Sequence, residues 1–216
     1  MRAVIVESPV SDLPSPLPLA AVPAPRPVPG KTPIGELLEV LAASRQLEPL
    51  INTTGRLLVN CLKDGGKIFA CGNGGSAADA MHLTQELVGR YQANRRALPA
   101  LCLNSDVAAL TCIGNDYGYD QVFARQLAAF ARPGDFLVGF STSGNSPNVL
   151  AAFAAARAAG VKTVLLGGRD GGRARGTCDF ELIIPSANTA RIQEVHTLIL
   201  HSWLDFIDRE FAPPGA

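Results

Sequence analysis

The stretch DFLVGFSTSGNSPNVL occupies residues 135–150 and places an apolar run directly before a polar turn rich in hydroxyl groups. The run DFLVGFS (135–141) is typical of a strand that is buried on both faces, as in a parallel sheet. Pro147 follows the turn, and proline is a favoured first residue of a helix. The stretch therefore predicts a strand, a tight turn and a helix, which is the repeating unit of α/β folds.

Four other short apolar runs repeat this pattern on either side. They are expected to be buried strands and are KIFAC (67–71), PALCLN (99–104), TVLLGG (163–168) and FELIIPS (180–186). Helical patterns separate most of these runs and cover approximately Ser76–Val88, Asp120–Phe130, Pro147–Ala159 and Thr189–Phe211. The alternation predicts an α/β domain with a doubly wound, mainly parallel five-stranded sheet flanked by helices.

The N-terminal part of the chain divides into two regions. Residues 1–32 hold half of the sixteen prolines, which oppose both helix and central strand because they fix φ and lack an amide donor. We expect an extended or disordered tail there. From Thr32 to Leu62, leucines and isoleucines recur at helical spacing, which predicts an N-terminal helical layer. A single domain is expected over residues 33–212.

Charge and cysteine content exclude several classes of protein. Nineteen Lys and Arg balance nineteen Asp and Glu, so bulk charge attracts neither nucleic acid nor an anionic membrane. The five cysteines are odd in number and lack CxxC spacing, which indicates a reducing compartment. No run approaches the roughly 18 apolar residues of a spanning helix, and the first residues lack the layout of a signal peptide. We expect a cytoplasmic protein without nucleic-acid or membrane partners.

Two turns that follow predicted strands are candidate ligand sites, because ligands bind beyond the carboxyl ends of strands in such sheets. The first is CGNGGS (71–76), whose glycines allow close backbone approach and whose following helix presents amides to an anion. It suits a sugar phosphate or its hydroxyls. The alternative is a tight turn with Ser76 as the helix N-cap.

The second turn, STSGNS (141–146), brings four hydroxyls near the positive end of a helix dipole. Hydroxyls and helix-terminal amides bind phosphate without a lysine. No GK[ST] follows, so this is not a Walker loop. We favour a phosphate cradle over a capped helix preceded by a polar turn.

Ionisable groups cluster on two of the expected helices. His82 and Glu86 stand at i and i+4 and share one face, which suits metal ligands, a general base or an ordinary surface pair. The last helix carries His196 and His201, and a lone histidine on an apolar helix is more often a core residue than a ligand. Gln193 and His201 lie about 80° apart around that helix and about 12 Å along it. We therefore hypothesise that these groups converge from different copies of the helix, at a subunit interface.

Taken in order along the chain, these motifs resemble the phosphoheptose isomerases of the SIS (sugar isomerase) family. The resemblance covers roughly residues 33–210 and rests on CGNGGSAADAMHLTQELVGRY (71–91), IGNDYG (113–118), STSGNS (141–146), GGRDGG (167–172) and ARIQEVHTLILH (190–201). It implies an enzyme that converts sedoheptulose 7-phosphate to D-glycero-D-manno-heptose 7-phosphate for heptose and lipopolysaccharide biosynthesis. It further implies one zinc ion per site and a homotetramer with active sites at subunit interfaces.

The resemblance also implies roles for individual residues. Glu86 would be the base that moves a carbon-bound proton, and His201 the acid that moves an oxygen-bound one, with an enediol(ate) between the two steps. The zinc ligands would be His82, Glu86, Gln193 and His201. The substrate contacts would be Asn73, Gly74, Gly75, Glu86, Asn115, Asp116, Ser141, Thr142, Ser143, Ser146 and Gln193.

Two positions depart from the commoner pattern of this family. Gln85 stands where an acidic residue often precedes the glutamate, and Ala190 where an aspartate often precedes the arginine of the last helix. Either change could alter site electrostatics, substrate choice or subunit contacts. The alternatives are a noncatalytic sugar-phosphate-binding regulator, of the type that associates with the replication initiator, and an isomerase of another sugar phosphate. Retention of both Glu86 and His201 favours the enzyme.

Overall fold

The computed structural model describes residues 32–213, so the expected tail over residues 1–32 lies, apart from Thr32, outside the described residues. The helices and strands are α1 (Pro33–Ser44), η1 (Arg45–Leu47), α2 (Glu48–Lys63), β1 (Ile68–Gly72), α3 (Gly75–Val88), β2 (Ala100–Cys102), α4 (Val107–Tyr117), η2 (Tyr119–Gln121), α5 (Ala124–Phe130), β3 (Phe136–Ser141), α6 (Pro147–Ala158), β4 (Lys162–Gly168), η3 (Gly172–Ala174), β5 (Phe180–Ile184) and α7 (Thr189–Phe211). Within residues 32–213, no helix has the length and apolar character that a bilayer span requires.

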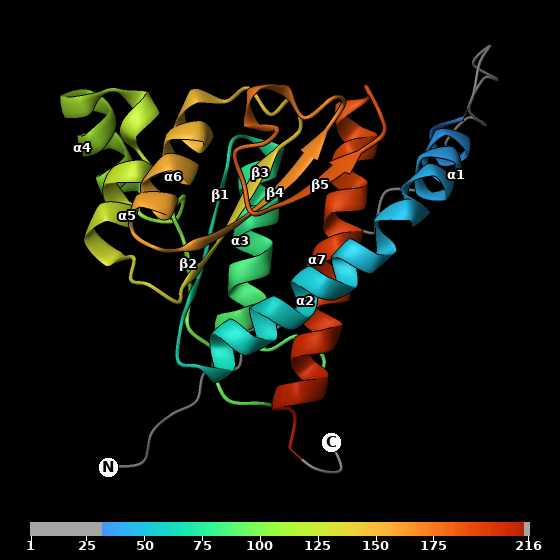
Figure 1. The fold of residues 1–216 in the computed structure, drawn as a ribbon, viewed down its shortest axis with the longest axis horizontal. Helices are drawn as coiled ribbons and strands as arrows, with labels where there is room; N and C mark the ends of the chain where they lie inside the picture. The colour runs from blue at the N-terminus through green and yellow to red at the C-terminus, as the bar shows by residue number, and fades with distance from the viewer. Residues whose placement is uncertain (1–31, 214–216) are drawn as a thin grey trace, which may run out of the picture. The chain divides into compact units, whose positions relative to one another are not determined.

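The strands of the described region form one parallel sheet in the order β2-β1-β3-β4-β5 (Figure 1). Ala70 in β1 is in register with Cys102 of β2 on one side and with Val138 of β3 on the other. The chain leaves β1 toward β2 and then returns to the opposite side for β3, which places the topological switch point between β1 and β3. The predicted doubly wound, five-stranded sheet is confirmed.

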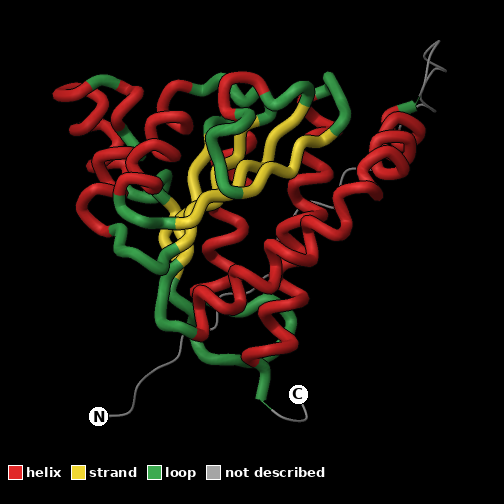
Figure 2. The backbone as a smooth tube through the Cα atoms, viewed as in Figure 1, coloured by secondary structure: helices red, strands yellow, loops and turns green. Residues whose placement is uncertain are grey.

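Helices cover both faces of the sheet (Figure 2). Because successive side chains of a strand point to opposite faces, β3 contributes to two cores. Phe136 and Val138 pack with residues of α2, α3 and α7, whereas Leu137 packs with residues of α5 and α6. The resulting three layers fix α3 on one face and α6 on the other, and both helices begin at the carboxyl edge of the sheet.

The N-terminal helical layer belongs to the core because α2 packs closely against α7. Trp203 of α7 is fully buried, and its indole N–H donates to the Ile51 carbonyl and to Thr54 Oγ1, each at 3.1 Å. A Cβ added at Gly55 would lie 2.9 Å from the Phe206 ring and 3.0 Å from the Trp203 ring, so both rings would have to shift to admit a side chain there. Truncation of such a buried indole typically costs about 3–5 kcal/mol. The predicted layer therefore holds α7, and with it the side chains that α7 presents.

Two stretches differ from the sequence-based expectation. Residues 107–117 form α4, for which no helix was predicted, and Asp106 caps it by accepting from the Ala109 amide at 2.9 Å. Ile113 is the one buried residue of α4, so the apolar periodicity that would have revealed the helix is weak. The expected helix Asp120–Phe130 is a 3₁₀ turn followed by α5, which begins at Ala124.

Candidate active site

Two turns begin side by side at the switch point, because Gly72 at the end of β1 is in register with Phe140 of β3. One turn leads to α3 and the other to α6. Gly74, with φ of 57°, is the N-cap of α3, so the expectation of Ser76 as N-cap is wrong; Ser76 lies buried in the first turn. Neither Gly74 nor Ser146, the N-cap of α6, makes a side-chain cap hydrogen bond. The positive ends of two helix dipoles therefore lie at this edge.

The turn after β3 gathers the hydroxyl groups predicted for a phosphate. Ser141 is buried, and its Oγ lies 3.4 Å from Ser146 Oγ. Ser143 Oγ accepts a hydrogen bond from the Asn145 amide at 3.2 Å, and Thr142 is half-buried beside it. The predicted strand–turn–helix unit is confirmed, while phosphate binding stays a prediction.

A second glycine-rich loop supports this turn. Gly144 has φ of 63°, and a Cβ there would lie 1.8 Å from the Gly171 carbonyl oxygen, so the position accepts only glycine. The Gly144 carbonyl accepts from the Ala174 amide at 2.9 Å, and Asn145 Oδ1 accepts from the Arg173 amide at 3.0 Å. The GGRDGG motif therefore acts as the support of the hydroxyl turn.

The ionisable side chains of α3 and α7 meet within one chain. His82 Nε2 lies 3.5 Å from Glu86 Oε1 and 3.4 Å from His201 Nε2. The two imidazole rings are nearly perpendicular, at 81°, and Tyr91 stacks on the His201 ring. Glu86 and the two histidines are each partly exposed, so they remain open to a ligand. The structure thus brings three of the four predicted metal ligands together without a second copy of the chain.

Gln193 lies elsewhere. Its side-chain amide contacts the glycine turn, since a Cβ added at Gly75 would lie 2.5 Å from Gln193 Nε2. His82 is seven residues further along α3, which corresponds to about 10 Å. Gln193 is predicted to be both a substrate contact and a metal ligand. Its position at the glycine turn is compatible with the first role, whereas a shared metal site with His82, Glu86 and His201 does not form within one chain. Among residues 32–213, no three His, Cys, Asp or Glu side chains converge on a single metal position.

The histidine pair nevertheless suits zinc in chemistry and in spacing. Zinc takes imidazole nitrogen and carboxylate oxygen at about 2.0–2.1 Å in tetrahedral geometry, which sets two ligand atoms about 3.3 Å apart. The separations of His82 Nε2 from His201 Nε2 and from Glu86 Oε1, 3.4 and 3.5 Å, are close to that value. Each of these two pairs is therefore spaced like two zinc ligands, although the three side chains do not surround one metal position within the described residues.

Asn115 and Asp116 lie on α4, and both are exposed. Asn115 Nδ2 donates to Asp116 Oδ1 at 2.8 Å, and Asp116 Oδ2 lies 3.6 Å from Cys112 Sγ. No contact within the described residues joins either side chain to the turns or to the histidine pair. One chain therefore does not assemble these two predicted substrate contacts with the others.

Two ties that the sequence did not reveal hold α3 against α7 around the histidine pair. One turn before His82 and His201, Asp79 Oδ1 accepts from Thr197 Oγ1 at 3.0 Å. Burial raises the pKa of Asp79, although the hydrogen bond from Thr197 and the proximity of His82 oppose the change. Its second oxygen, Oδ2, is buried without a protein partner.

The other tie is centred on Arg95. Its guanidinium donates to Asp208 Oδ1 on α7 at 2.8 Å and to the carbonyl oxygens of Glu86 and Leu87 at 2.7 and 3.0 Å. A cation at the end of α3 compensates the negative end of the helix dipole. Arg95 thereby fixes the backbone of the residue predicted to be the catalytic base.

His196 is a core residue. It is fully buried, its Nε2 lies 2.9 Å from the Gly167 carbonyl oxygen, and its ring packs edge-on against Phe140. Burial lowers the pKa of His196 to about 4, against the hydrogen bond to Gly167. The expectation that a lone histidine on an apolar helix belongs to the core is confirmed here.

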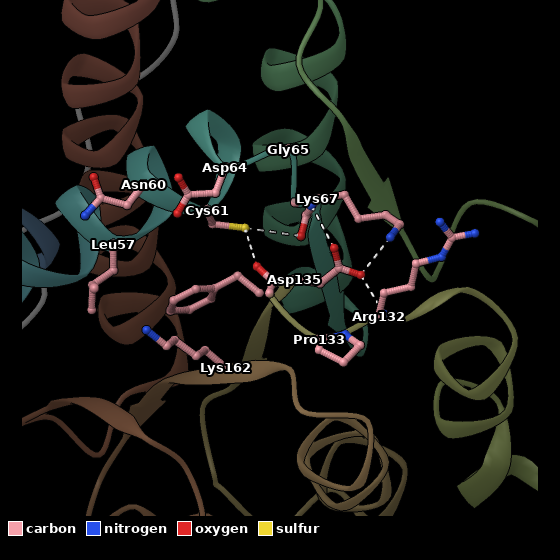
Figure 3. Close-up of a pocket in the computed structure, with 13 residues that line it drawn as sticks. Leu57, Asn60, Cys61, Asp64, Gly65, Lys67, Arg132, Pro133, Asp135 and Lys162 are labelled. Atoms are coloured by element: carbon pink, nitrogen blue, oxygen red, sulfur yellow. Dashed lines mark hydrogen bonds and ion pairs between the residues drawn. The ribbon is translucent and has the colours of Figure 1, made fainter.

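A cavity of about 410 Å³ lies at the opposite, amino edge of the sheet (Figure 3). The Asp135 carboxylate accepts there from the Lys67 amide at 2.9 Å, from Lys67 Nζ at 2.7 Å and from the Arg132 amide at 2.8 Å. These ionic groups satisfy one another and tie β1 to β3. The cavity contains none of the predicted site residues, and ligands of parallel sheets bind at the other edge.

Comparison with known proteins agrees with this geometry. A family model described as SIS domain matches residues 34–168. The phosphoheptose isomerase of Aliarcobacter butzleri is 53% identical over 165 residues, 76% of this chain and 87% of the relative. Solved structures of phosphoheptose isomerases from Francisella tularensis (TM-score 0.79, 38% identity) and Neisseria gonorrhoeae (TM-score 0.75, 43% identity) each cover 82% of this chain, and 94% and 95% of their own chains respectively.

The chain therefore belongs to the SIS domain family. Within that family it groups with the phosphoheptose isomerases, as the resemblance of its motifs implied. The predicted enzyme class, an aldose–ketose isomerase for a sugar phosphate, is confirmed.

Proposed function

We propose that this chain converts sedoheptulose 7-phosphate to D-glycero-D-manno-heptose 7-phosphate, in the cytoplasm, as a step of heptose biosynthesis for lipopolysaccharide. The observation that carries the proposal is the convergence of His82, Glu86 and His201 from α3 and α7. A regulator that only binds sugar phosphates needs the two turns but has no use for this convergence. Relatives about half identical to the chain are phosphoheptose isomerases, which supports the substrate.

The two turns would bind the substrate. The hydroxyls of the 141–146 turn and the amides at the start of α6 supply donors for the phosphate group. The glycine turn and Gln193 face the sugar from the start of α3, since Gln193 contacts Gly75. The full set of proposed substrate contacts is Asn73, Gly74, Gly75, Glu86, Asn115, Asp116, Ser141, Thr142, Ser143, Ser146 and Gln193.

Glu86 would act as the base. It removes a proton from C1 of the ketose, and the electron pair of that bond forms the C1–C2 double bond of an enediol(ate). Protonation of C2 and loss of the C1 hydroxyl proton then give the aldose, so no atom is gained or lost. His201 would move the proton between the two oxygens. Since Arg95 holds the Glu86 backbone, the carboxylate keeps its place through both transfers.

Zinc is the proposed cofactor, one ion per site, held by His82, Glu86 and His201. Zinc would polarise the substrate carbonyl and stabilise the negative charge that develops on its oxygen. The remaining proposed ligand, Gln193, lies at the glycine turn of its own chain, so in this proposal it reaches the metal from a neighbouring copy. Equilibrium dialysis with zinc tests the proposal, and a His82→Ala variant should lose the bound metal.

A homotetramer with active sites at subunit interfaces is part of the proposal. An open groove of about 600 Å³ adjoins His82, and its apolar side chains Met81, Val88 and Leu101 are 43%, 52% and 36% exposed. Apolar surface beside a site is typical of surfaces that another chain covers. Light scattering during gel filtration measures the assembly, and Val88→Asp should dissociate it.

The test of the function is turnover of sedoheptulose 7-phosphate by the purified chain, with and without added zinc. Glu86→Gln and His201→Ala should each lower kcat by about 100- to 10,000-fold, the usual contribution of a general acid or base. Glu194→Gln is the matched control, because Glu194 is an exposed carboxylate on α7. If the zinc-supplemented wild type binds the sugar phosphate without converting it, the substrate or the enzymatic function is wrong.

A further inference from the structure

Asn73 and Asn148 form a reciprocal amide pair across the switch point. Asn73 Nδ2 donates to Asn148 Oδ1, and Asn148 Nδ2 donates to Asn73 Oδ1, both at 2.9 Å. Asn73 is in the turn after β1, whereas Asn148 is in the first turn of α6 and is only 1% exposed. The pair therefore joins the glycine turn to the helix that follows the hydroxyl turn.

The backbone N–H of Val149 fixes the orientation of the Asn148 carboxamide, and through it that of the Asn73 carboxamide. The Val149 N–H donates to Asn148 Oδ1 at 3.0 Å and to the Ser146 carbonyl oxygen at 3.1 Å. If the Asn148 carboxamide were turned over, its NH₂ group would face this N–H, and two donors cannot bond to each other. Asn148 must therefore turn its Nδ2 toward Asn73. Because Asn148 Nδ2 is a donor, Asn73 must in turn present its Oδ1 there and keep its own Nδ2 toward Asn148 Oδ1. The first turn of α6 thus dictates the orientation of the Asn73 amide.

The Asn73 oxygen has a second partner. The Tyr119 hydroxyl, in η2, donates to Asn73 Oδ1 at 3.2 Å, although the Tyr119 side chain is largely exposed. With Oδ1 engaged twice and one Nδ2 hydrogen bonded to Asn148, the group that Asn73 has left to offer is its second N–H. A donor of fixed direction suits a hydroxyl or carbonyl oxygen of the sugar.

We propose that Asn148 is a positioning residue, which orients the Asn73 amide so that Asn73 offers one N–H to an oxygen of the sugar phosphate. This inference rests on the proposed function, because it assumes that the substrate occupies the glycine turn. Asn148 itself is buried behind Asn73 and acts only through that residue.

A double-mutant cycle tests the proposal, with kcat and KM for sedoheptulose 7-phosphate measured for the wild type, Asn73→Ala, Asn148→Ala and the double variant. Each single substitution should lower kcat/KM about tenfold, mainly through KM, since one hydrogen bond to the substrate is lost. Because Asn148 acts through Asn73, the double variant should be no worse than Asn73→Ala alone. Asn60→Ala, an exposed asparagine on α2, should keep wild-type constants.

Asn148→Asp adds a test that preserves the size of the side chain. Aspartate still accepts from the Val149 amide but cannot donate to Asn73 Oδ1, so kcat/KM should fall at least as far as in Asn148→Ala. Additive losses in the double variant, or kcat/KM within twofold of wild type in Asn148→Asp, would overturn the proposal. If the wild type does not turn over the sugar, the proposed function fails instead, and the same cycle measured as Kd for the sugar phosphate still decides the role of Asn148.

Discussion

The imidazole Nε2 atoms of His82 and His201 lie 3.4 Å apart, although 119 residues separate the two histidines along the chain. The contact exists because α3 and α7 pack on the same face of the sheet, and the Asp79–Thr197 and Arg95–Asp208 pairs tie the two helices on either side of it. Any change that shifts one helix along the other should therefore disturb the site before it unfolds the domain.

The tie at Arg95 predicts an acid-sensitive contribution to stability. Burial of Asp208 favours its neutral form, but hydrogen bonds from the Ala93 amide, Arg95 and the Gln92 amide outweigh burial and hold its pKa below the ordinary 3.8. The contribution is thus present above pH 3.8 and is lost as the pH falls through the folded-state value. Denaturant unfolding between about pH 2 and 5 should show this loss in the wild type and a smaller one in Asp208→Asn. Equal pH dependence in both proteins would contradict the assignment.

His196 predicts a second pH effect in a different range. Its pKa is lowered from 6.5 to about 4, mainly by burial, so the unfolded chain takes up a proton that the folded chain does not. Stability contributed by neutral His196 is complete above pH 6.5 and falls as the pH drops toward 4, by about 3 kcal/mol in all. In His196→Leu, the free energy of unfolding should no longer fall with pH over this range. The substitution can also change the stability at pH 8, but that change does not depend on the titration of His196. A slope that persists in this variant would assign the effect to other groups.

The close packing of the hydroxyl turn (141–146) predicts that alanine substitutions at Gly144 and at Gly65 have very different effects on kcat/KM. Gly144→Ala places a methyl group 1.8 Å from the Gly171 carbonyl oxygen and should lower kcat/KM at least about 100-fold, because the phosphate donors are displaced. Gly65 is the matched control, since its φ of 82° is also positive but nothing lies within 4 Å of an added Cβ. Both variants place an alanine at a positive φ and so share the same kind of backbone strain. A difference in kcat/KM between them therefore measures the effect of the clash with the Gly171 carbonyl oxygen. Similar kcat/KM in the two variants would show that the turn does not bind substrate.

The strands and most helices were predictable because their apolar periodicity is local. The β3 run and Pro147 of the following helix, for example, lie next to each other in the sequence. The position of Gln193 was not predictable, because its spacing from other residues of α7 says nothing about the glycine turn that packs against it. The Asn73–Asn148 pair was equally hidden, since 75 residues separate its members and neither belongs to a motif whose spacing implies contact. The helix α4 was not predicted because little of it is buried, so its sequence has only a weak apolar periodicity.

The central claim is an isomerisation through proton transfer by Glu86, and conversion of sedoheptulose 7-phosphate in D₂O, followed by NMR, tests it most directly. An enediol(ate) whose C2 receives a proton from an exchangeable base gives an aldose carrying deuterium at C2. We predict that the wild type forms this deuterated aldose and that Glu86→Gln forms it at least about 100-fold more slowly. Undiminished conversion by Glu86→Gln, with or without deuterium at C2 of the aldose, would contradict the account.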